Sequence, residues 1–169
     1  MNFRVFNINL FTATVIIFSL LMLDQGSKIF IKLNYPLSLY GSNAVVDWGF
    51  FKLLFVENKG MAMGAKLNDF LPFFSDKTAK LFLTIFRLVA ILGIGYWLLD
   101  NIRKESANLF RWALCLIFAG ALGNIIDSVF YGMIFSHSYG KVATLFAENG
   151  GYAPIFQGHV VDMLHCPLG

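Results

Sequence analysis

The stretch WALCLIFAGALGNIIDSVFYGMIF, residues 112–135, decides the fold. Its 24 residues include a single charged side chain, that of Asp127. A helix needs about 20 predominantly apolar residues to cross the hydrocarbon core of a bilayer. The stretch therefore predicts a membrane-spanning helix. Because ionisable groups inside a span are costly to bury, Asp127 is also a candidate functional residue.

Two further runs have the same character: residues 5–23 carry no charge, and residues 81–99 carry only Arg87. Of the 169 residues, 57% are hydrophobic and 14% are charged, whereas soluble domains have roughly 25% charged residues. We expect a mainly α-helical membrane protein with one membrane-embedded domain, residues 1–169. Its transmembrane helices should span about residues 9–34, 79–99 and 109–135.

The first run also resembles a secretory signal. It is too long for the apolar segment of such a signal and lacks a small-x-small cleavage pattern, so an uncleaved first span is the better interpretation.

The long connection, residues 35–77, lacks helical periodicity. Its segment 48–56 is aromatic and β-rich, which predicts a strand. Residues 57–60 are typical of a turn, and residues 61–65 could form a second strand. We therefore expect a small β-sheet on the membrane surface, with a loop over residues 136–169.

The orientation follows from the distribution of basic residues. The short loop between the second and third helices contains Arg103 and Lys104, and Arg111 follows it. Dense positive charge in a short loop favours the cytoplasmic side. The connection 35–77 and the segment 136–169 should then both lie outside, facing the periplasm.

Other classes of function have little support. The net charge is only +3 and no basic stripe is present, so we expect no nucleic-acid partner. Cys115 and Cys166 have no paired spacing, and the three histidines match no metal motif.

Polar residues near the helix ends are the candidate site. Asp24 and Lys28 are spaced i,i+4, and Asn124 and Asp127 are spaced i,i+3, so each pair shares a helix face. Such groups can serve chemistry, mark the membrane boundary, or only hold helices together. Arg87 could snorkel outward or meet a carboxylate on a neighbouring helix, and such a pairing could be structural or functional. A lone Asp162 follows an apolar pair and is weak evidence by itself.

Taken in order, four short motifs resemble those of lipoprotein signal peptidase, the type II signal peptidase of bacteria. A D-x-x-S-K box is matched by Asp24–Lys28, and N-x-G-x-A-x-G by Asn58–Gly64. A G-N-x-x-D box is matched by Gly123–Asp127, and V-V-D by Val160–Asp162. Each box is weak alone, but the four in this order cover nearly the whole chain.

The resemblance implies an aspartic endopeptidase of the bacterial inner membrane. It would remove signal peptides from prolipoproteins, cutting before the cysteine that carries a diacylglyceryl group. Two aspartates sharing a site cannot both ionise easily, so one holds a proton while the other activates water. By the V-V-D box, Asp162 is the expected catalytic aspartate. The expected supporting or substrate-binding residues are Asp24, Lys28, Asn58, Gly60, Asn124 and Asp127.

The resemblance implies no metal and no organic cofactor. The expected partners are the diacylglyceryl-prolipoprotein substrate and the lipid bilayer, and we expect a monomer.

Three departures from the family pattern stand out. Ser128 follows the G-N-x-x-D box where most members have Arg, and an insert covers residues 135–158; both features resemble the Bacteroidetes branch. The family's second catalytic aspartate lies in an F-N-x-A-D box opening a fourth helix, and the 169 residues end before it. We therefore expect a C-terminally truncated, inactive chain, with Asp127 as the less favoured partner of Asp162.

The rival hypothesis is a non-enzymatic membrane protein, such as a transporter subunit or an assembly factor. Its buried polar residues would only hold helices together. Transporters usually show internal repeats or interrupted helices in corresponding positions. The sequence shows neither, and the rival gives no reason for the order of the four boxes.

Overall fold

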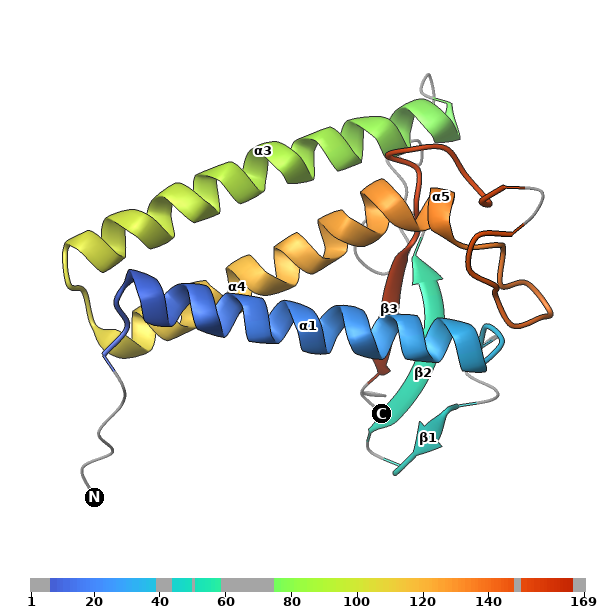
Figure 1. The fold of residues 1–169 in the computed structure, drawn as a ribbon, viewed down its shortest axis with the longest axis horizontal. Helices are drawn as coiled ribbons and strands as arrows, with labels where there is room; N and C mark the ends of the chain where they lie inside the picture. Colours follow the sequence, from blue (N-terminus) through green and yellow to red (C-terminus); the bar gives the residue numbers. More distant parts are fainter. Residues whose placement is uncertain (1–6, 39–43, 50, 59–74, 148–149, 166–169) are drawn as a thin grey trace.

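Three long helices form the body of the molecule in the computed structural model, which describes residues 7–38, 44–49, 51–58, 75–147 and 150–165. They are α1 (Leu10–Asn34), α3 (Asp76–Arg103) and α4 (Asn108–Ile126). Helix α4 packs against both α1 and α3 and lies between them (Figure 1). The bundle is therefore organised around the helix that carries the G-N-x-x-D box.

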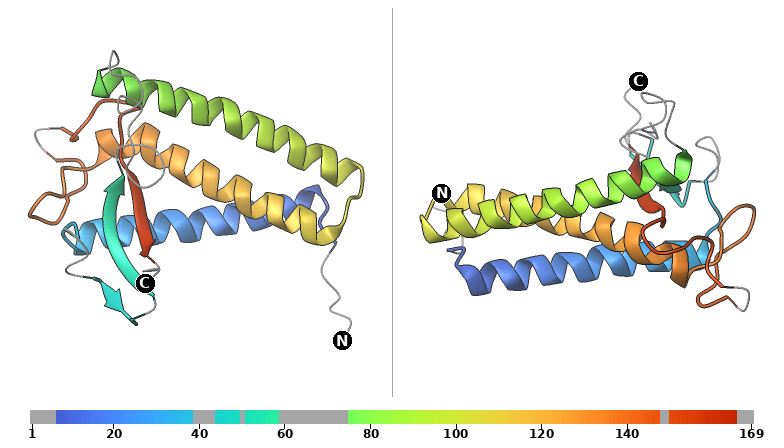
Figure 2. Two further views of the ribbon diagram at one scale, coloured as in Figure 1. Left: turned by 180° about the vertical axis from the view of Figure 1, so that it is seen from behind. Right: turned by 90° about the horizontal axis from the view of Figure 1, so that it is seen from above.

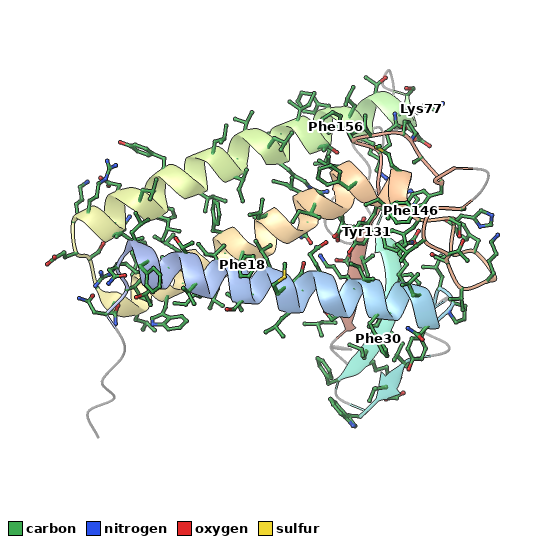
Figure 3. The ribbon with its side chains drawn as sticks, in the orientation of Figure 1. Phe18, Phe30, Lys77, Tyr131, Phe146 and Phe156 are labelled. Atoms are coloured by element: carbon green, nitrogen blue, oxygen red, sulfur yellow. The ribbon has the colours of Figure 1, made fainter. Side chains whose placement is uncertain are left out.

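All three helices are long and apolar enough to cross a membrane, over Leu10–Asn34, Asp76–Arg103 and Asn108–Ile134. This finding confirms the three predicted spans. Large apolar side chains cover their outer surfaces: Phe18 is 61% exposed, Phe30 58% and Leu92 74%. Figure 3 shows Phe30 pointing away from the bundle. Such surfaces suit lipid hydrocarbon, where apolar exposure carries no cost.

The helix boundaries have local causes. Helix α1 begins after Asn9, whose side-chain oxygen accepts a hydrogen bond from the Thr12 N–H at 2.8 Å. It ends before the dipeptide Tyr35-Pro36, because a residue that precedes proline disfavours helical backbone angles. Helix α3 begins after Ser75, whose hydroxyl accepts from the Thr78 N–H at 3.2 Å.

The third span changes its winding near its end. Helix α4 continues into a π-helical turn, η2 (Asp127–Tyr131), and then into α5 (Gly132–Ile134). Backbone carbonyls near a helix end need partners outside the helix. The segment 135–158 supplies them, because Gly158 donates to the Ser128 carbonyl at 2.8 Å and Ala153 donates to the Gly132 carbonyl at 3.0 Å.

A small antiparallel sheet lies at the same end of the bundle (Figures 1 and 2). Its strands are β1 (Val46–Asp47), β2 (Lys52–Asn58) and β3 (Val160–His165), in the order β1-β2-β3. Phe55 of β2 and Val161 of β3 are buried against Tyr131 and Phe135. This apolar cluster fixes the sheet to the end of the third span.

The small sheet was predicted, but its details differ from the prediction. A single strand over 48–56 is wrong, because the Trp48 N–H donates to the Phe51 carbonyl at 2.9 Å and Gly49 has φ of 78°. A turn over 57–60 is also wrong at Glu57 and Asn58, which extend β2. The suggested second strand at 61–65 lies outside the described residues.

The prediction of a loop over residues 136–169 is wrong at Val160–His165, which form the strand β3. It forms because Val160 and Val161 pair with Asn58 and Glu57 of β2. This pairing carries the V-V-D box into the sheet, so Asp162 occupies a strand and not a loop.

Candidate active site

Asp162 lies on β3, directly opposite Val56 of β2. Its side chain is exposed and, among the described residues, has no hydrogen-bond or ion-pair partner. It faces a cavity of about 550 Å³ between the sheet and the ends of α1 and α4. The cavity is lined by Asp24, Lys28, Leu54, Val56, Gly120, Asn124, Val161, Asp162, Met163 and Leu164.

Lys28 joins three of the predicted site residues. Its ammonium nitrogen lies 3.0 Å from Asp24 Oδ2, 2.8 Å from Asp127 Oδ2 and 3.1 Å from Asn124 Oδ1. Asp24 and Lys28 come from α1, whereas Asn124 and Asp127 come from the third span. The structure thus brings together residues of two boxes about 100 positions apart in the chain, and neither pair is a simple boundary marker.

Asp127 is fully buried and connects this ion cluster to the strand that carries Asp162. Its Oδ2 accepts a hydrogen bond from the Val161 N–H at 3.2 Å. Val161 immediately precedes Asp162, so the contact fixes the strand beside its exposed carboxylate. Asp127 therefore has the geometry of a supporting residue.

Gln25 completes the cluster, and the sequence analysis missed it. Its amide nitrogen donates to Asp127 Oδ1 at 3.0 Å and to Asp24 Oδ2 at 2.9 Å. Its amide oxygen accepts a hydrogen bond from the Tyr131 hydroxyl at 3.1 Å. A signal was present, since an amide beside Asp24 in an apolar span is costly unless it has partners.

Two glycines permit the close approach of backbone and carboxylate here. A Cβ at Gly123 would collide with the carboxylate of Asp24 and lie 3.1 Å from its Cγ. A Cβ at Gly158 would collide with the backbone carbonyl of Asp127. The first explains why glycine occupies the G-N-x-x-D box at that position, and the second why glycine ends the insert.

Arg87 of α3 reaches the same turn from the other side. Its guanidinium donates to the Ser128 hydroxyl at 3.0 Å, and that hydroxyl donates to the Asn124 carbonyl at 2.9 Å. Arg87 therefore contacts the residue that follows the G-N-x-x-D box. Of the alternatives for Arg87, the structure supports a partner on a neighbouring helix.

Asn58 and Gly60 complete the predicted set. Asn58 is the last residue of β2, half-buried and opposite Val160. Gly60 lies outside the described residues.

A second polar cluster, not predicted from the sequence, lies behind the sheet. We call it the buried strut: Lys32, Glu57, Ser138 and His159. The Lys32 ammonium contacts the Glu57 carboxylate and donates to Ser138 Oγ at 2.9 Å. Ser138 donates to Glu57 Oε1 at 2.8 Å, and His159 Nδ1 lies 3.0 Å from Glu57 Oε2.

The other members of the buried strut favour the ionised form of the Glu57 carboxyl. Burial opposes the charged form of its carboxyl, but the hydrogen bond with His159 and the charge of Lys32 outweigh it, and the pKa falls to about 2. The strut connects α1, β2, the insert and the residue that leads into β3. It therefore fixes the insert to the sheet.

The described residues form three long apolar helices and a cavity at the sheet end, which is lined by the exposed carboxylate of Asp162. These features define a multi-spanning membrane protein with a polar site near the ends of its helices. The family model described as signal peptidase (SPase) II matches residues 16–169. The chain therefore belongs to the signal peptidase II family.

Relatives named lipoprotein signal peptidase support this assignment. The protein of Porphyromonas gingivalis is 45% identical over 150 residues, covering 88% of this chain and 60% of the relative. That of Amoebophilus asiaticus is 33% identical over 150 residues, covering 87% and 56%. That of Caldanaerobacter subterraneus is 31% identical over 160 residues, covering 88% and 99%.

The chain spans about 60% of the length of the Porphyromonas gingivalis relative. That relative agrees with the expected resemblance to the Bacteroidetes branch. The comparisons give no support to the rival hypothesis of a transporter subunit or assembly factor. No solved structure matches the chain.

Proposed function

We propose that the chain is the membrane-embedded peptidase domain of an enzyme that removes signal peptides from diacylglyceryl-modified prolipoproteins. The observation that carries the proposal is the cavity at the sheet end of the bundle. One wall carries the exposed Asp162, and apolar side chains of Leu54, Val56 and Leu164 line the same space. A peptide that emerges from a bilayer with attached acyl chains offers matching apolar surface.

The proposed chemistry is hydrolysis by two carboxyl groups. Asp162 is one of them, because its side chain reaches the cavity. A pair that shares one site holds one proton between them, so one carboxyl group donates while the other activates water. No step requires a cofactor.

Neither of the other two site aspartates suits the second role. Asp127 is fully buried, ion-paired to Lys28 and hydrogen-bonded to the strand. Asp24 is ion-paired to Lys28 and receives the Gln25 amide. We therefore assign both to support. By resemblance to the family, we assign the second carboxyl group to the aspartate of the F-N-x-A-D box.

The proposed location is the inner membrane, with the cavity on the periplasmic side. The connection between α3 and α4 lies at the opposite end of the bundle from the sheet (Figure 1). It follows Arg103 and contains Lys104, both exposed. Basic residues in a short loop favour the cytoplasmic side, which leaves the sheet, Asn58 and the cavity outside.

The test is a cleavage assay in membranes from cells that express the protein from its own gene and have no other signal peptidase II. The first substrate is a prolipoprotein with a diacylglyceryl group on its cysteine. The second is the same precursor with that cysteine replaced by serine, which cannot be lipidated. We expect cleavage of the first alone, before the modified cysteine, as measured by mass spectrometry.

Two outcomes would contradict the proposal. Absence of cleavage of the lipidated precursor would refute the peptidase activity. Equal cleavage of both precursors would refute the assigned substrate class.

A further inference from the structure

The turn between β1 and β2 carries two aromatic rings at a corner of the sheet. The rings of Trp48 and Phe51 are stacked, with their centroids 5.7 Å apart and their planes inclined by 23°. Trp48 is nevertheless 65% exposed. The turn is closed by the Trp48 N–H, which donates to the Phe51 carbonyl at 2.9 Å. Asp47 Oδ1 also accepts a hydrogen bond from the Gly49 N–H at 2.8 Å. The fold therefore holds an exposed tryptophan in a fixed place.

This turn lies beside the bundle and not beyond its end. In Figure 1 the strands β2 and β3 run across the axes of the three helices, and β1 lies past α1 on the side away from α3. The last turns of α1 extend at least as far along the bundle as β1 does (Figures 1 and 2). Helix α1 is long and apolar enough to span a membrane up to Asn34. A bilayer that surrounds α1 would therefore meet this corner of the sheet at its surface.

The chemistry of the turn suits the boundary between lipid headgroups and hydrocarbon. Tryptophan is enriched at this boundary, because its ring is apolar and its N–H needs a polar partner. An ion pair between Lys52 and Asp47 lies at the same turn, with 2.8 Å between Nζ and Oδ2. Charges are costly in the hydrocarbon core, so the pair limits how deeply the turn can enter it. The lipid-facing surface of α1 includes Phe30, which is 58% exposed and lies on the side of α1 that β1 occupies (Figure 3).

We propose that the β1–β2 turn is an interfacial membrane anchor, in which Trp48 and Phe51 contact the lipid headgroup region beside α1. The two rings supply the apolar contact area, and the neighbouring ion pair stays on the aqueous side of them. Strand β2 continues from this turn to Leu54 and Val56, which line the cavity. The anchor therefore holds the cavity at the level of the bilayer surface. This role does not depend on the proposed peptidase activity.

The experiment measures where Trp48 lies relative to the bilayer. The protein expressed from its own gene is reconstituted in nanodiscs of phosphatidylethanolamine and phosphatidylglycerol, and the quenching of tryptophan fluorescence is compared among three quenchers. These are a nitroxide on the lipid headgroup, bromine atoms near the end of the lipid acyl chain, and acrylamide in the water. The contribution of Trp48 is the difference between the parent protein and Trp48→Leu. The matched control is Trp97→Leu, because Trp97 is also exposed, at 50%, but lies inside the α3 span.

We expect the headgroup nitroxide to quench the Trp48 signal at least about twofold more strongly than the acyl-chain bromine does, because about 15 Å separate the headgroups from the centre of the bilayer. Acrylamide should have only partial access to Trp48, since lipid covers one side of the turn. The signal of Trp97 should be quenched by lipid and protected from acrylamide, which calibrates the assay for a tryptophan inside a span.

Three results would overturn the proposal. Quenching of Trp48 by acrylamide without quenching by either lipid would place the turn in water. Stronger quenching by the acyl-chain bromine than by the headgroup nitroxide would place it in the hydrocarbon core. Protection from all three quenchers would show that another protein surface, such as a second copy of the chain, covers the turn. If Trp48→Leu does not fold, Trp48→Phe gives the same difference while keeping an aromatic ring stacked on Phe51.

Discussion

Replacing Lys32 with methionine should destabilise the protein, because it removes one partner of a buried ion pair. The Lys32 side chain is 0% exposed, and its ammonium contacts Glu57 and Ser138. It also lies over the rings of Phe135 and Tyr152, 5.3 and 5.2 Å from their centroids. Methionine keeps the apolar length of the side chain and removes only the charge.

The magnitude follows from the burial of both partners. Removing one partner from a buried ion pair costs about 3–5 kcal/mol, because the other charge stays buried without compensation. Glu57 keeps its contacts with Ser138 and His159 in the variant. We therefore expect a loss near the lower end, about 3 kcal/mol. Replacing Glu57 by methionine as well should cost less than the sum of the two single changes.

The assay is equilibrium unfolding in detergent micelles, followed by tryptophan fluorescence. The matched control is Lys104→Met, which breaks an exposed pair with Asp100 at 2.7 Å. That pair is in water, so its removal should leave the unfolding midpoint within experimental error. Equal midpoints for Lys32→Met and the parent protein would refute the view that the buried strut stabilises the fold.

Three further predictions concern the same end of the molecule. Gly158→Ala should cost at least about 1–3 kcal/mol of unfolding free energy, because its Cβ would meet a backbone carbonyl, whereas Gly26→Ala has open space and should be tolerated in the same assay. Because the pKa of Glu57 lies at about 2 in the fold, its stabilisation should be complete above about pH 4.3 and be lost as the pH falls towards 2; acid unfolding curves of Glu57→Gln should lack that loss. Gln25→Leu should cost about 1–3 kcal/mol, since it leaves the Tyr131 hydroxyl without its acceptor, and a thermal midpoint equal to that of the parent would contradict this.

The three spans could be predicted from the sequence because the bilayer fixes the length of an apolar helix. The predicted ranges 9–34, 79–99 and 109–135 lie close to the long apolar helices at Leu10–Asn34, Asp76–Arg103 and Asn108–Ile134. Two pairs of site residues, Asp24 with Lys28 and Asn124 with Asp127, could also be predicted. Their i,i+4 and i,i+3 spacing alone places the two members of each pair on one helix face. That both pairs meet at one ammonium group required the packing of α1 against α4.

The sheet and the buried strut could not be predicted in the same way. The strand β3 exists because Val160 pairs with Asn58, a partner about 100 residues away in the chain. Nothing local distinguishes Val160-Val161-Asp162 from a loop with two apolar residues. Lys32 and Glu57 likewise form a pair only when α1 meets β2. In the sequence alone, these two residues look like ordinary charged surface residues, because nothing local shows that they are buried in the fold.

The insert, residues 135–158, could be a lid or a partner-binding loop, and the sequence alone offers no physical basis for choosing between them. In the structure its backbone donates to carbonyls at the π-helical turn, and Ser138 joins the buried strut. These contacts explain why a longer connection is tolerated between the third span and β3. The insert therefore contacts both the end of the third span and the buried strut beside β3.

The most direct measurement of the central claim compares Asp162→Asn with Asp47→Asn in cleavage of a diacylglyceryl-modified precursor. Both substitutions remove one exposed carboxylate from the same sheet, and only Asp162 lines the cavity. We predict that Asp162→Asn abolishes cleavage while membrane insertion is unchanged, and that Asp47→Asn cleaves like the parent protein. Retained cleavage in Asp162→Asn would contradict the assignment of Asp162 as a catalytic residue.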